Sequence, residues 1–359
     1  MNNIKSYFIS YLLFFQFVSY FLYLKFENYI FLLCYFFIGF ASFFTIRKVN
    51  KTILLISIFV VSIFLIFSMS SRENSFILNA YNVLLGVFAF LSAYVLYLSD
   101  RFYNYIKVMF WAYSLMILYY FYMFGLSDPD LYNNIFVKGS RNYVSAIYIF
   151  LFCLLILSYD KDNIKVPIVY PMVTFLGCII LYGRSGIIIS FVIMMYLYFF
   201  NKRYLLFKLA LIIAVIFIVV FNLEQIMSFF IEKTSFSYGV ESERTVMIQE
   251  YKNGILYSLD NFILGFKLDG CCATIKLFDS NPHNSFIAGH IRYGIFHLIF
   301  VLSVLTYILL SGKSLYIFIS LVYFFRLFLD QLGLFSPLDV ILFYIIFLIN
   351  GNKRDKRIA

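Results

Sequence analysis

Long apolar runs separated by short polar or charged segments make up most of the chain. A helix needs about 20 apolar residues to cross the hydrocarbon core of a bilayer, and fewer when its flanking residues reach the headgroups. By this measure the pattern predicts about twelve transmembrane helices, several of them short. The predicted spans are residues 7–24, 29–46, 52–70, 76–98, 108–126, 143–159, 166–182, 186–200, 204–221, 285–310, 313–329 and 336–350.

The composition leads to the same fold class. Of the 359 residues, 63% are hydrophobic and only 13% are charged. A soluble domain of this size could not cover so much apolar surface with polar groups, so lipid must cover it. We therefore expect an all-α integral membrane protein, a single polytopic domain over residues 1–359, with one large loop outside the membrane.

The basic residues between the apolar runs predict the orientation. If the N-terminus is cytoplasmic, the inner connections hold many of the lysines and arginines, whereas the short outer loops after the first and third spans hold only Lys25 and Arg72. Positively charged connections stay on the cytoplasmic side. We expect both termini to be cytoplasmic and the chain to lie in a bacterial inner membrane. This topology explains the net charge of +10 without a nucleic-acid partner.

Two outer segments are longer than the other outer connections. The first covers residues 127–142 and ends in Gly139-Ser140-Arg141-Asn142. The second, residues 222–284, is the predicted large periplasmic loop and mixes charge, glycine and amphipathic pieces. Polar side chains that act on a substrate outside the membrane are expected in these two segments.

Within the large loop the pattern predicts one helix followed by turns. Ser242 can cap a helix with apolar positions at Val246 and Met247, which leaves Arg244 near the helix start. Residues 261–270 carry two glycines and are interpreted as turns.

Cys271 and Cys272 are neighbours in this loop, on the oxidising side of the membrane. A disulfide between adjacent cysteines can form but is strained and uncommon. The sequence therefore favours two unbonded cysteines.

All three histidines of the chain, His283, His290 and His297, are spaced seven residues apart. This spacing places them on one face of a helix, about 10 Å apart along its axis. Ligands of one zinc ion lie about 2 Å from the metal, so we expect no metal site here. For His290 and His297 the pattern favours hydrogen-bonded packing inside a buried helix face.

His283 differs from the other two histidines because of the residues before it. Asn281 can cap a helix, and Pro282 suits the first helical position. His283 would then lie in an exposed first turn, where the helix dipole disfavours a charged imidazole. A neutral imidazole can accept a proton, and the unpaired N–H groups of such a turn favour an anionic ligand.

Arginines near the outer face form a second group of candidates. Arg184 lies in the tight turn Tyr182-Gly183-Arg184-Ser185-Gly186, and Arg141 and Arg244 lie in the two long outer segments. Arg292 lies inside a predicted span, where functional use is the first hypothesis for a charge. Guanidinium groups bind phosphate oxygens with two hydrogen bonds, so the group suits a lipid-linked pyrophosphate. The alternative for each arginine is an interfacial anchor or a structural ion pair.

Nucleotide-dependent chemistry has no signature in this chain. It contains neither a phosphate-binding P-loop with its lysine nor a dinucleotide-binding fingerprint. The outer loops also carry no paired-carboxylate metal motif. Donors activated by a nucleotide in the cytoplasm are therefore not expected.

Together these motifs resemble the O-antigen polymerase and ligase superfamily. The resemblance rests on Arg184-Ser185-Gly186, then Ser242-Glu243-Arg244, Leu264-Gly265-Phe266 and His283-Asn284, and covers residues 180–300. In the ligases His-Asn is followed by nine residues and a glycine, and Gly294 fits this spacing. The usual small or aromatic residue three positions later is His297 here, which departs from the ligase pattern. Gly139-Ser140-Arg141-Asn142 resembles a segment common among the polymerases.

The resemblance implies a membrane-embedded glycosyltransferase that joins oligosaccharide repeat units at the periplasmic face, without a metal or other cofactor. Its donor and acceptor would be oligosaccharides carried on undecaprenyl pyrophosphate, and its partners would be membrane lipid and a chain-length regulator. Carried over by motif, Arg184 and Arg244 would hold the pyrophosphate, His283 would act as the base, and Asn284 would orient His283 or the substrate. Further contacts to substrate are expected from Arg141, Arg292 and His290.

Three functions compete for this set of residues. A repeat-unit polymerase is favoured, and a ligase that transfers finished glycan to lipid A core is the near alternative. A flippase for lipid-linked oligosaccharide belongs to a different class. It should carry cations along the middle of several helices and show internal pseudo-symmetry, whereas the cations here gather towards one face.

Overall fold

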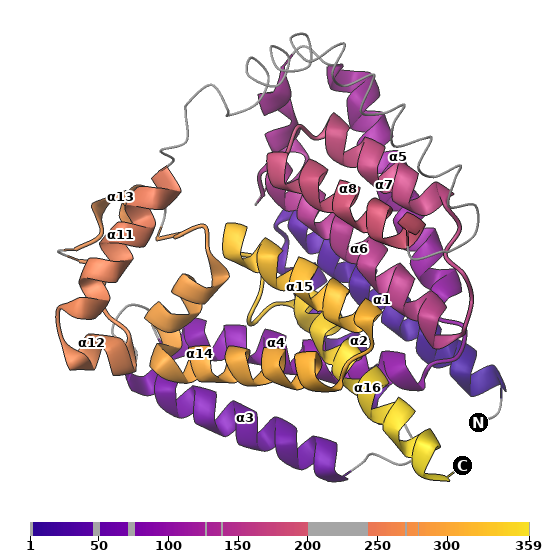
Figure 1. Cartoon of the computed structure of the whole chain (residues 1–359), viewed down its shortest axis with the longest axis horizontal. Helices are drawn as coiled ribbons and strands as arrows, with labels where there is room; N and C mark the ends of the chain where they lie inside the picture. Colours follow the sequence, from indigo (N-terminus) through magenta and orange to yellow (C-terminus); the bar gives the residue numbers. More distant parts are fainter. Residues whose placement is uncertain are drawn as a thin grey trace. The chain divides into compact units, whose positions relative to one another are not determined.

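The computed structural model describes residues 3–45, 51–70, 76–125, 128–137, 139–199, 243–269, 271–278 and 280–358 (Figure 1). Within these ranges the chain is helical, and the only β-type pairing is an isolated bridge between Phe136 and Gly139. The predicted all-α class is confirmed for this part of the chain. The helices are α1 (Asn3–Phe26), α2 (Tyr29–Phe44), α3 (Lys51–Ser70), α4 (Phe76–Leu98), α5 (Tyr103–Phe124), η1 (Pro129–Asn134), α6 (Arg141–Lys161), α7 (Val169–Ile180), α8 (Arg184–Phe199), α11 (Glu243–Leu256), α12 (Leu259–Leu264), α13 (Ala273–Leu277), α14 (Ser285–Ser311), α15 (Ser314–Leu329), η3 (Pro337–Asp339) and α16 (Val340–Ile358).

Five of the described helices are long and apolar enough to cross a membrane. Each predicted span other than 204–221 coincides with a helix, whereas residues 204–221 lie outside the described part. Several of these helices are short: α7 has 12 residues and covers about 18 Å, less than the hydrocarbon core. The number of spans therefore stays a prediction. The five long segments are Phe8–Phe26, Phe76–Leu98, Tyr103–Phe124, Arg141–Lys161 and Ser285–Ser311.

The chain divides into two compact units. Unit 1 comprises Met1–Met109, Cys153–Ile164 and Glu243–Ala359, and unit 2 comprises Phe110–Phe152 and Lys165–Ser242. Helices α5 and α6 each contribute residues to both units. The division therefore does not test the prediction of one polytopic domain.

Aromatic rings fill the core of unit 1 where α3, α4 and α14 meet. The Phe64 ring of α3 packs edge-on against Tyr293 of α14, with ring centroids 5.4 Å apart, and against Phe335, with centroids 4.5 Å apart. The Tyr293 hydroxyl donates a hydrogen bond of 3.0 Å to the Asn79 carbonyl of α4. Edge-to-face aromatic packing adds to the burial of apolar surface, so this cluster ties α14 to the N-terminal helices.

Three short helices of the predicted large loop, α11, α12 and α13, pack on the first part of α14. Their shared core contains Met247, Phe266 and Cys272 from the loop together with Ile287 and Ile291 of α14. Glu250 of α11 accepts hydrogen bonds from the backbone N–H groups of Thr274 and Ile275, which satisfies otherwise unpaired donors at the start of α13. The described part of the loop is thus a folded layer that shares its core with α14.

Two glycines allow α12 to approach the backbone of α14 closely. Helix α14 bends at Gly294, where φ is 61° and ψ is −158°, a conformation that is essentially restricted to glycine. A Cβ atom at Gly294 would overlap the Ile263 carbonyl oxygen. A Cβ atom at Gly265, where φ is +79°, would lie 2.7 Å from the His290 carbonyl oxygen. Both glycines of the resembled motif therefore serve this backbone contact.

The structure corrects two local predictions in the loop. Residues 261–264 belong to α12, so within the described part of the predicted turn segment only residues 265–269 lack a helix. The Ser258 side chain caps α12 by accepting a hydrogen bond from Asn261 N–H. Cys271 and Cys272 form a disulfide, against the prediction of unbonded cysteines. The predicted helix after Ser242 is confirmed as α11, and Ser242 itself lies outside the described residues.

The close approach at Gly294 predicts a large loss of stability in Gly294→Ala. The substitution adds both left-handed backbone strain and an overlap with Ile263, which together cost about 3 kcal/mol or more. Gly125→Ala is a matched control, because Gly125 also has a positive φ of +62° but no described atom lies within 4 Å of its added Cβ. The control should lose about 1 kcal/mol. Unfolding of both purified variants in detergent measures the difference, and equal losses would contradict the docking described above.

Candidate active site

His283 lies just before α14 and not within it. The helix begins at Ser285, and His283 has a positive φ of 47°. Its backbone N–H donates to the Asn281 side chain at 2.9 Å, and its ring packs edge-on against Phe278, with centroids 5.4 Å apart. The prediction that Asn281 caps the helix and that His283 occupies its first turn is therefore wrong, because the Asn281 side chain closes a turn before the helix.

Asn284 is the residue that caps α14. Its side-chain oxygen accepts hydrogen bonds from Phe286 N–H at 2.9 Å and Ile287 N–H at 3.1 Å. The side chain is 4% exposed. Because His283 directly precedes Asn284 in the chain, this cap keeps His283 next to the N-terminal end of α14. The predicted direct role of Asn284 towards substrate stays a prediction.

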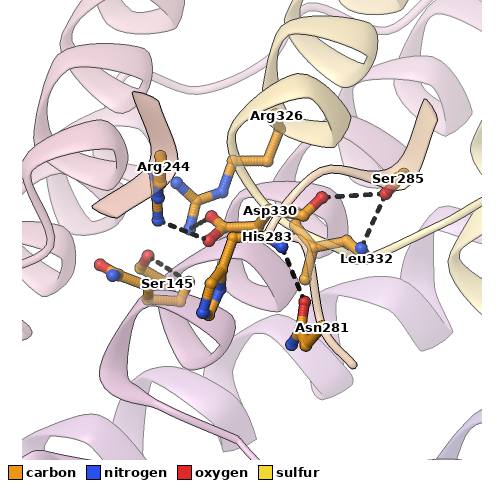
Figure 2. A network of polar contacts seen from close by, with 9 residues as sticks. Ser145, Arg244, Asn281, His283, Ser285, Arg326, Asp330 and Leu332 are labelled. Carbon is orange, nitrogen blue, oxygen red and sulfur yellow. Dashed lines mark hydrogen bonds and ion pairs between the residues drawn. The ribbon is translucent and has the colours of Figure 1, made fainter. Parts of the chain in front are cut away.

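Arg244 of α11 reaches the segment that follows α15. Its Nη2 atom lies 3.1 Å from Oδ1 of Asp330, and Figure 2 shows this contact with His283 beside it. The Arg244 side chain is 36% exposed, whereas that of Asp330 is 11% exposed. The Arg244 guanidinium is therefore bound to Asp330 through Nη2, and its exposed part is accessible to a ligand.

Asp330 has a second cationic partner, Arg326 of α15. Arg326 Nη2 lies 3.2 Å from Asp330 Oδ2, and the Arg326 side chain is fully buried. The two arginines and the carboxylate together carry one net positive charge. An uncompensated guanidinium at that depth would cost several kcal/mol, and the Asp330 carboxylate offsets this cost.

Hydrogen bonds hold the connection between α15 and α16 in place. The Ser285 hydroxyl donates to the Asp330 carbonyl oxygen at 2.9 Å and accepts from Leu332 N–H at 2.9 Å (Figure 2). Further along, the buried Asp339 carboxylate accepts from Leu334 N–H and from the Tyr323 hydroxyl of α15. The backbone on both sides of Asp330 is thus tied to α14, α15 and η3.

The surroundings of His283 favour its neutral form. Partial burial lowers the pKa of His283 below its ordinary value, and the positive charge of Arg244 lowers it further. The carboxylates of Asp330 and Glu243 act in the opposite direction and are the smaller influences on this pKa. A neutral imidazole at neutral pH can accept a proton.

Unit 2 brings Arg141 and Arg184 to neighbouring helix starts. Arg141 begins α6 and Arg184 begins α8. The first turns of these helices touch, because a Cβ atom on Gly186 would lie 2.8 Å from the Ser145 hydroxyl oxygen. Arg141 Nη1 lies 3.3 Å from Asp130, whose side chain is 79% exposed. These two predicted residues therefore share one end of unit 2.

The remaining candidates lie along α14. His290 is fully buried, and its Nε2 donates to the Phe262 carbonyl oxygen at 2.8 Å, so its predicted hydrogen-bonded packing is confirmed. His297 is fully buried beside Tyr293 and Phe335, which confirms its packing, whereas its predicted hydrogen bond is not found, since neither ring nitrogen has a partner among the described residues. Arg292 is half-buried and makes no hydrogen bond or ion pair with residues that the structure describes. The predicted substrate roles of His290 and Arg292 stay predictions.

The sequence reasoning missed Arg326 and Asp330. Both were visible in principle, since Arg326 is the only charged residue in a long apolar run and Asp330 follows at the i+4 position. A charge inside a predicted span is a functional hypothesis by default. Four residues on, an acidic side chain shares the same helix face and can pair with it.

Comparison of the chain with models of protein families, with curated proteins and with solved structures finds no match. Within the described ranges, no group of three or more histidine, cysteine, aspartate or glutamate side chains could hold a metal ion. The described residues provide a neutral imidazole next to two arginines and an aspartate that together carry one net positive charge. This set can accept a proton and stabilise an anionic leaving group.

The charges around His283 predict how it titrates. Because the chain has only three histidines, labelled imidazole signals can be followed by NMR and the signal of His283 assigned with His283→Gln. We expect a pKa below the ordinary value, and a higher pKa in Arg244→Gln, because a nearby positive charge is removed. Arg101→Gln is the control and should leave the pKa unchanged. A fall of the pKa in Arg244→Gln would contradict the arrangement.

Proposed function

We propose that this chain is a membrane-embedded glycosyltransferase that polymerises undecaprenyl-pyrophosphate-linked oligosaccharide repeat units into O-antigen or a similar surface polysaccharide. The observation that carries the proposal is the grouping of His283 with Arg244, Asp330 and Arg326 at the start of α14. A proton acceptor beside cationic donors suits the transfer of a sugar from a pyrophosphate carrier. The motif order in the sequence supports the same reaction class.

The proposed topology has about twelve spans in the bacterial inner membrane, with both termini in the cytoplasm. Residues 222–284 then form a periplasmic loop, to which α11, α12 and α13 belong. The start of α14 would lie at the periplasmic surface, where repeat units on their lipid carrier are presented. The apolar helices of the described chain support membrane insertion.

In the proposed reaction His283 takes the proton from the attacking sugar hydroxyl of the acceptor. The oxygen forms a bond to the anomeric carbon of the donor sugar, and the bond from that carbon to the phosphate oxygen breaks. Undecaprenyl pyrophosphate leaves with the electron pair, and Arg244 compensates the developing charge. The proton then passes from His283 to solvent. The resembled motifs imply that Arg184 and Arg141 also bind phosphate oxygens of the carrier.

A ligase is the second candidate, favoured by one specific observation. Gly294 follows His283-Asn284 at the spacing of the ligases and has a backbone conformation that requires glycine. Polymerase and ligase would share the donor, the leaving group and the base. They differ in the acceptor, which is another lipid-linked unit in one case and lipid A core in the other.

A surface-glycan gel from the native host tests the function. Deletion of the gene should leave single repeat units on the lipid and abolish the ladder of longer chains, and the wild-type gene should restore the ladder. At matched protein level His283→Gln should fail to restore it, because loss of a general base lowers the rate by about 10²–10⁴. Gln249→Ala, an exposed change on α11, is the control and should restore it.

The other outcomes of this experiment are informative. Loss of the single-unit band in the deletion strain would contradict polymerase activity and favour the ligase or a flippase. A full ladder with His283→Gln would show that His283 is not the base.

A further inference from the structure

Asp330 joins two cations that come from different parts of unit 1. One oxygen lies 3.1 Å from Arg244 of α11, and the other lies 3.2 Å from Arg326 of α15. Arg244 belongs to the folded loop layer, whereas Arg326 is fully buried. The carboxylate is therefore the direct link between the loop and the helix that ends beside it.

The geometry leaves little freedom for the Asp330 side chain. Its backbone carbonyl oxygen accepts from Ser285, and its backbone N–H donates to the Arg326 carbonyl oxygen at 3.1 Å. Arg326 lies one helical turn earlier on α15 and reaches the same carboxylate. With the backbone and one oxygen held in this way, the second oxygen presents a fixed acceptor to Arg244. Long arginine side chains lose considerable rotamer freedom when they are held in one geometry.

We propose that Asp330, backed by the buried Arg326, is the positioning residue that holds the Arg244 guanidinium ready for the pyrophosphate of the lipid carrier. This inference rests on the proposed function and adds residues to its site. Arg244 uses one edge for Asp330 and keeps its remaining N–H groups for phosphate oxygens. The alternative is a purely structural role, in which Asp330 serves only to neutralise the charge of Arg326.

A double substitution separates positioning from neutralisation. Asp330→Ala alone removes the carboxylate 3.2 Å from the buried Arg326, so it should reduce the yield of folded protein. In Arg326→Met/Asp330→Ala both charges are removed, and apolar replacement of a buried ion pair is often neutral or stabilising. The net charge of the site stays at one positive charge, that of Arg244. Any loss of anion binding in the double variant therefore reports the position of Arg244.

The first measurement uses full-length protein in detergent and inorganic pyrophosphate as the probe. We expect the double variant to keep the thermal midpoint of the wild type and to bind pyrophosphate about tenfold more weakly, the effect of one charge-assisted hydrogen bond. In the transfer assay, KM for the lipid-linked donor should rise by a similar factor. Wild-type affinity in the double variant would overturn the proposal, as would a wild-type protein that does not bind pyrophosphate.

A thermodynamic cycle tests whether Asp330 acts through Arg244. In the Arg244→Ala background, the same double substitution should change pyrophosphate affinity less than about twofold, because the group it positions is gone. A further tenfold loss in that background would overturn the proposal, since Asp330 or Arg326 would then contribute independently of Arg244.

The chain offers a matched control pair. Asp160 lies 3.1 Å from Lys313, the residue just before α15. Along that helix Lys313 is about 20 Å from Arg326 and about 26 Å from Asp330. Lys313→Met/Asp160→Ala removes an ion pair of the same unit and should leave pyrophosphate affinity unchanged; a matching tenfold loss there would overturn the proposal.

The outcomes distinguish this inference from the proposed function. Pyrophosphate binding that depends on Asp330 as described, without any transfer activity in the wild type, would support the positioning role and contradict the polymerase. If the double variant polymerises with the wild-type rate and KM, the polymerase function is supported and the positioning role of Asp330 is contradicted.

Discussion

The fully buried guanidinium of Arg326 is the constraint on which the site depends. A charge at such a position requires a counter-charge with fixed geometry. Asp330 supplies it one turn later, at the C-cap directly after α15. Because the carboxylate must face Arg326, the backbone of the next residues is set as well, and Ser285 of α14 bonds to both Asp330 and Leu332. The ends of two helices are therefore tied at one point, and Arg244 is bound to the same carboxylate.

Helix α14 connects this point to the folded loop. Its capped start presents His283, and its bend at Gly294 admits the backbone of α12. Between these positions His290 donates a hydrogen bond to the Phe262 carbonyl oxygen. The hydrogen-bonded packing predicted for His290 thus holds the loop layer onto the helix. The loop in turn carries α11 and Arg244. Packing, capping and charge pairing in unit 1 thus together fix where the His283 imidazole lies relative to the Arg244 guanidinium.

The helices could be predicted from the sequence because apolar run length is a direct physical signal for them. The short helix α12 was missed, since its six residues are too few for a periodic pattern and its glycine suggested only turns. Membrane crossing by the shorter helices does not follow from length alone. The disulfide between Cys271 and Cys272 was judged by the rarity of such bonds, and the structure contradicts that expectation.

For the site, sequence reasoning found residues whose local motif is unusual and missed those whose role depends on tertiary contacts. His283 and Arg244 were singled out in the loop, but Asn281 and Asn284 are both plausible caps, and only the backbone turn at His283 decides between them. The i+4 spacing can suggest that Asp330 pairs with Arg326, but it gives no sign of a link between Asp330 and the loop. The importance of Asp330 comes from Arg244, which lies 86 positions away in the sequence and reaches the same carboxylate.

The account is tested most directly by purified protein in vesicles that contain only undecaprenyl-pyrophosphate-linked single repeat units, with both the glycan and the lipid followed. It predicts glycans of two or more repeat units, with one undecaprenyl pyrophosphate released for every bond formed. Single units that stay intact on their lipid, including units that merely cross the bilayer, would contradict the assignment of a glycosyl transfer reaction to this site.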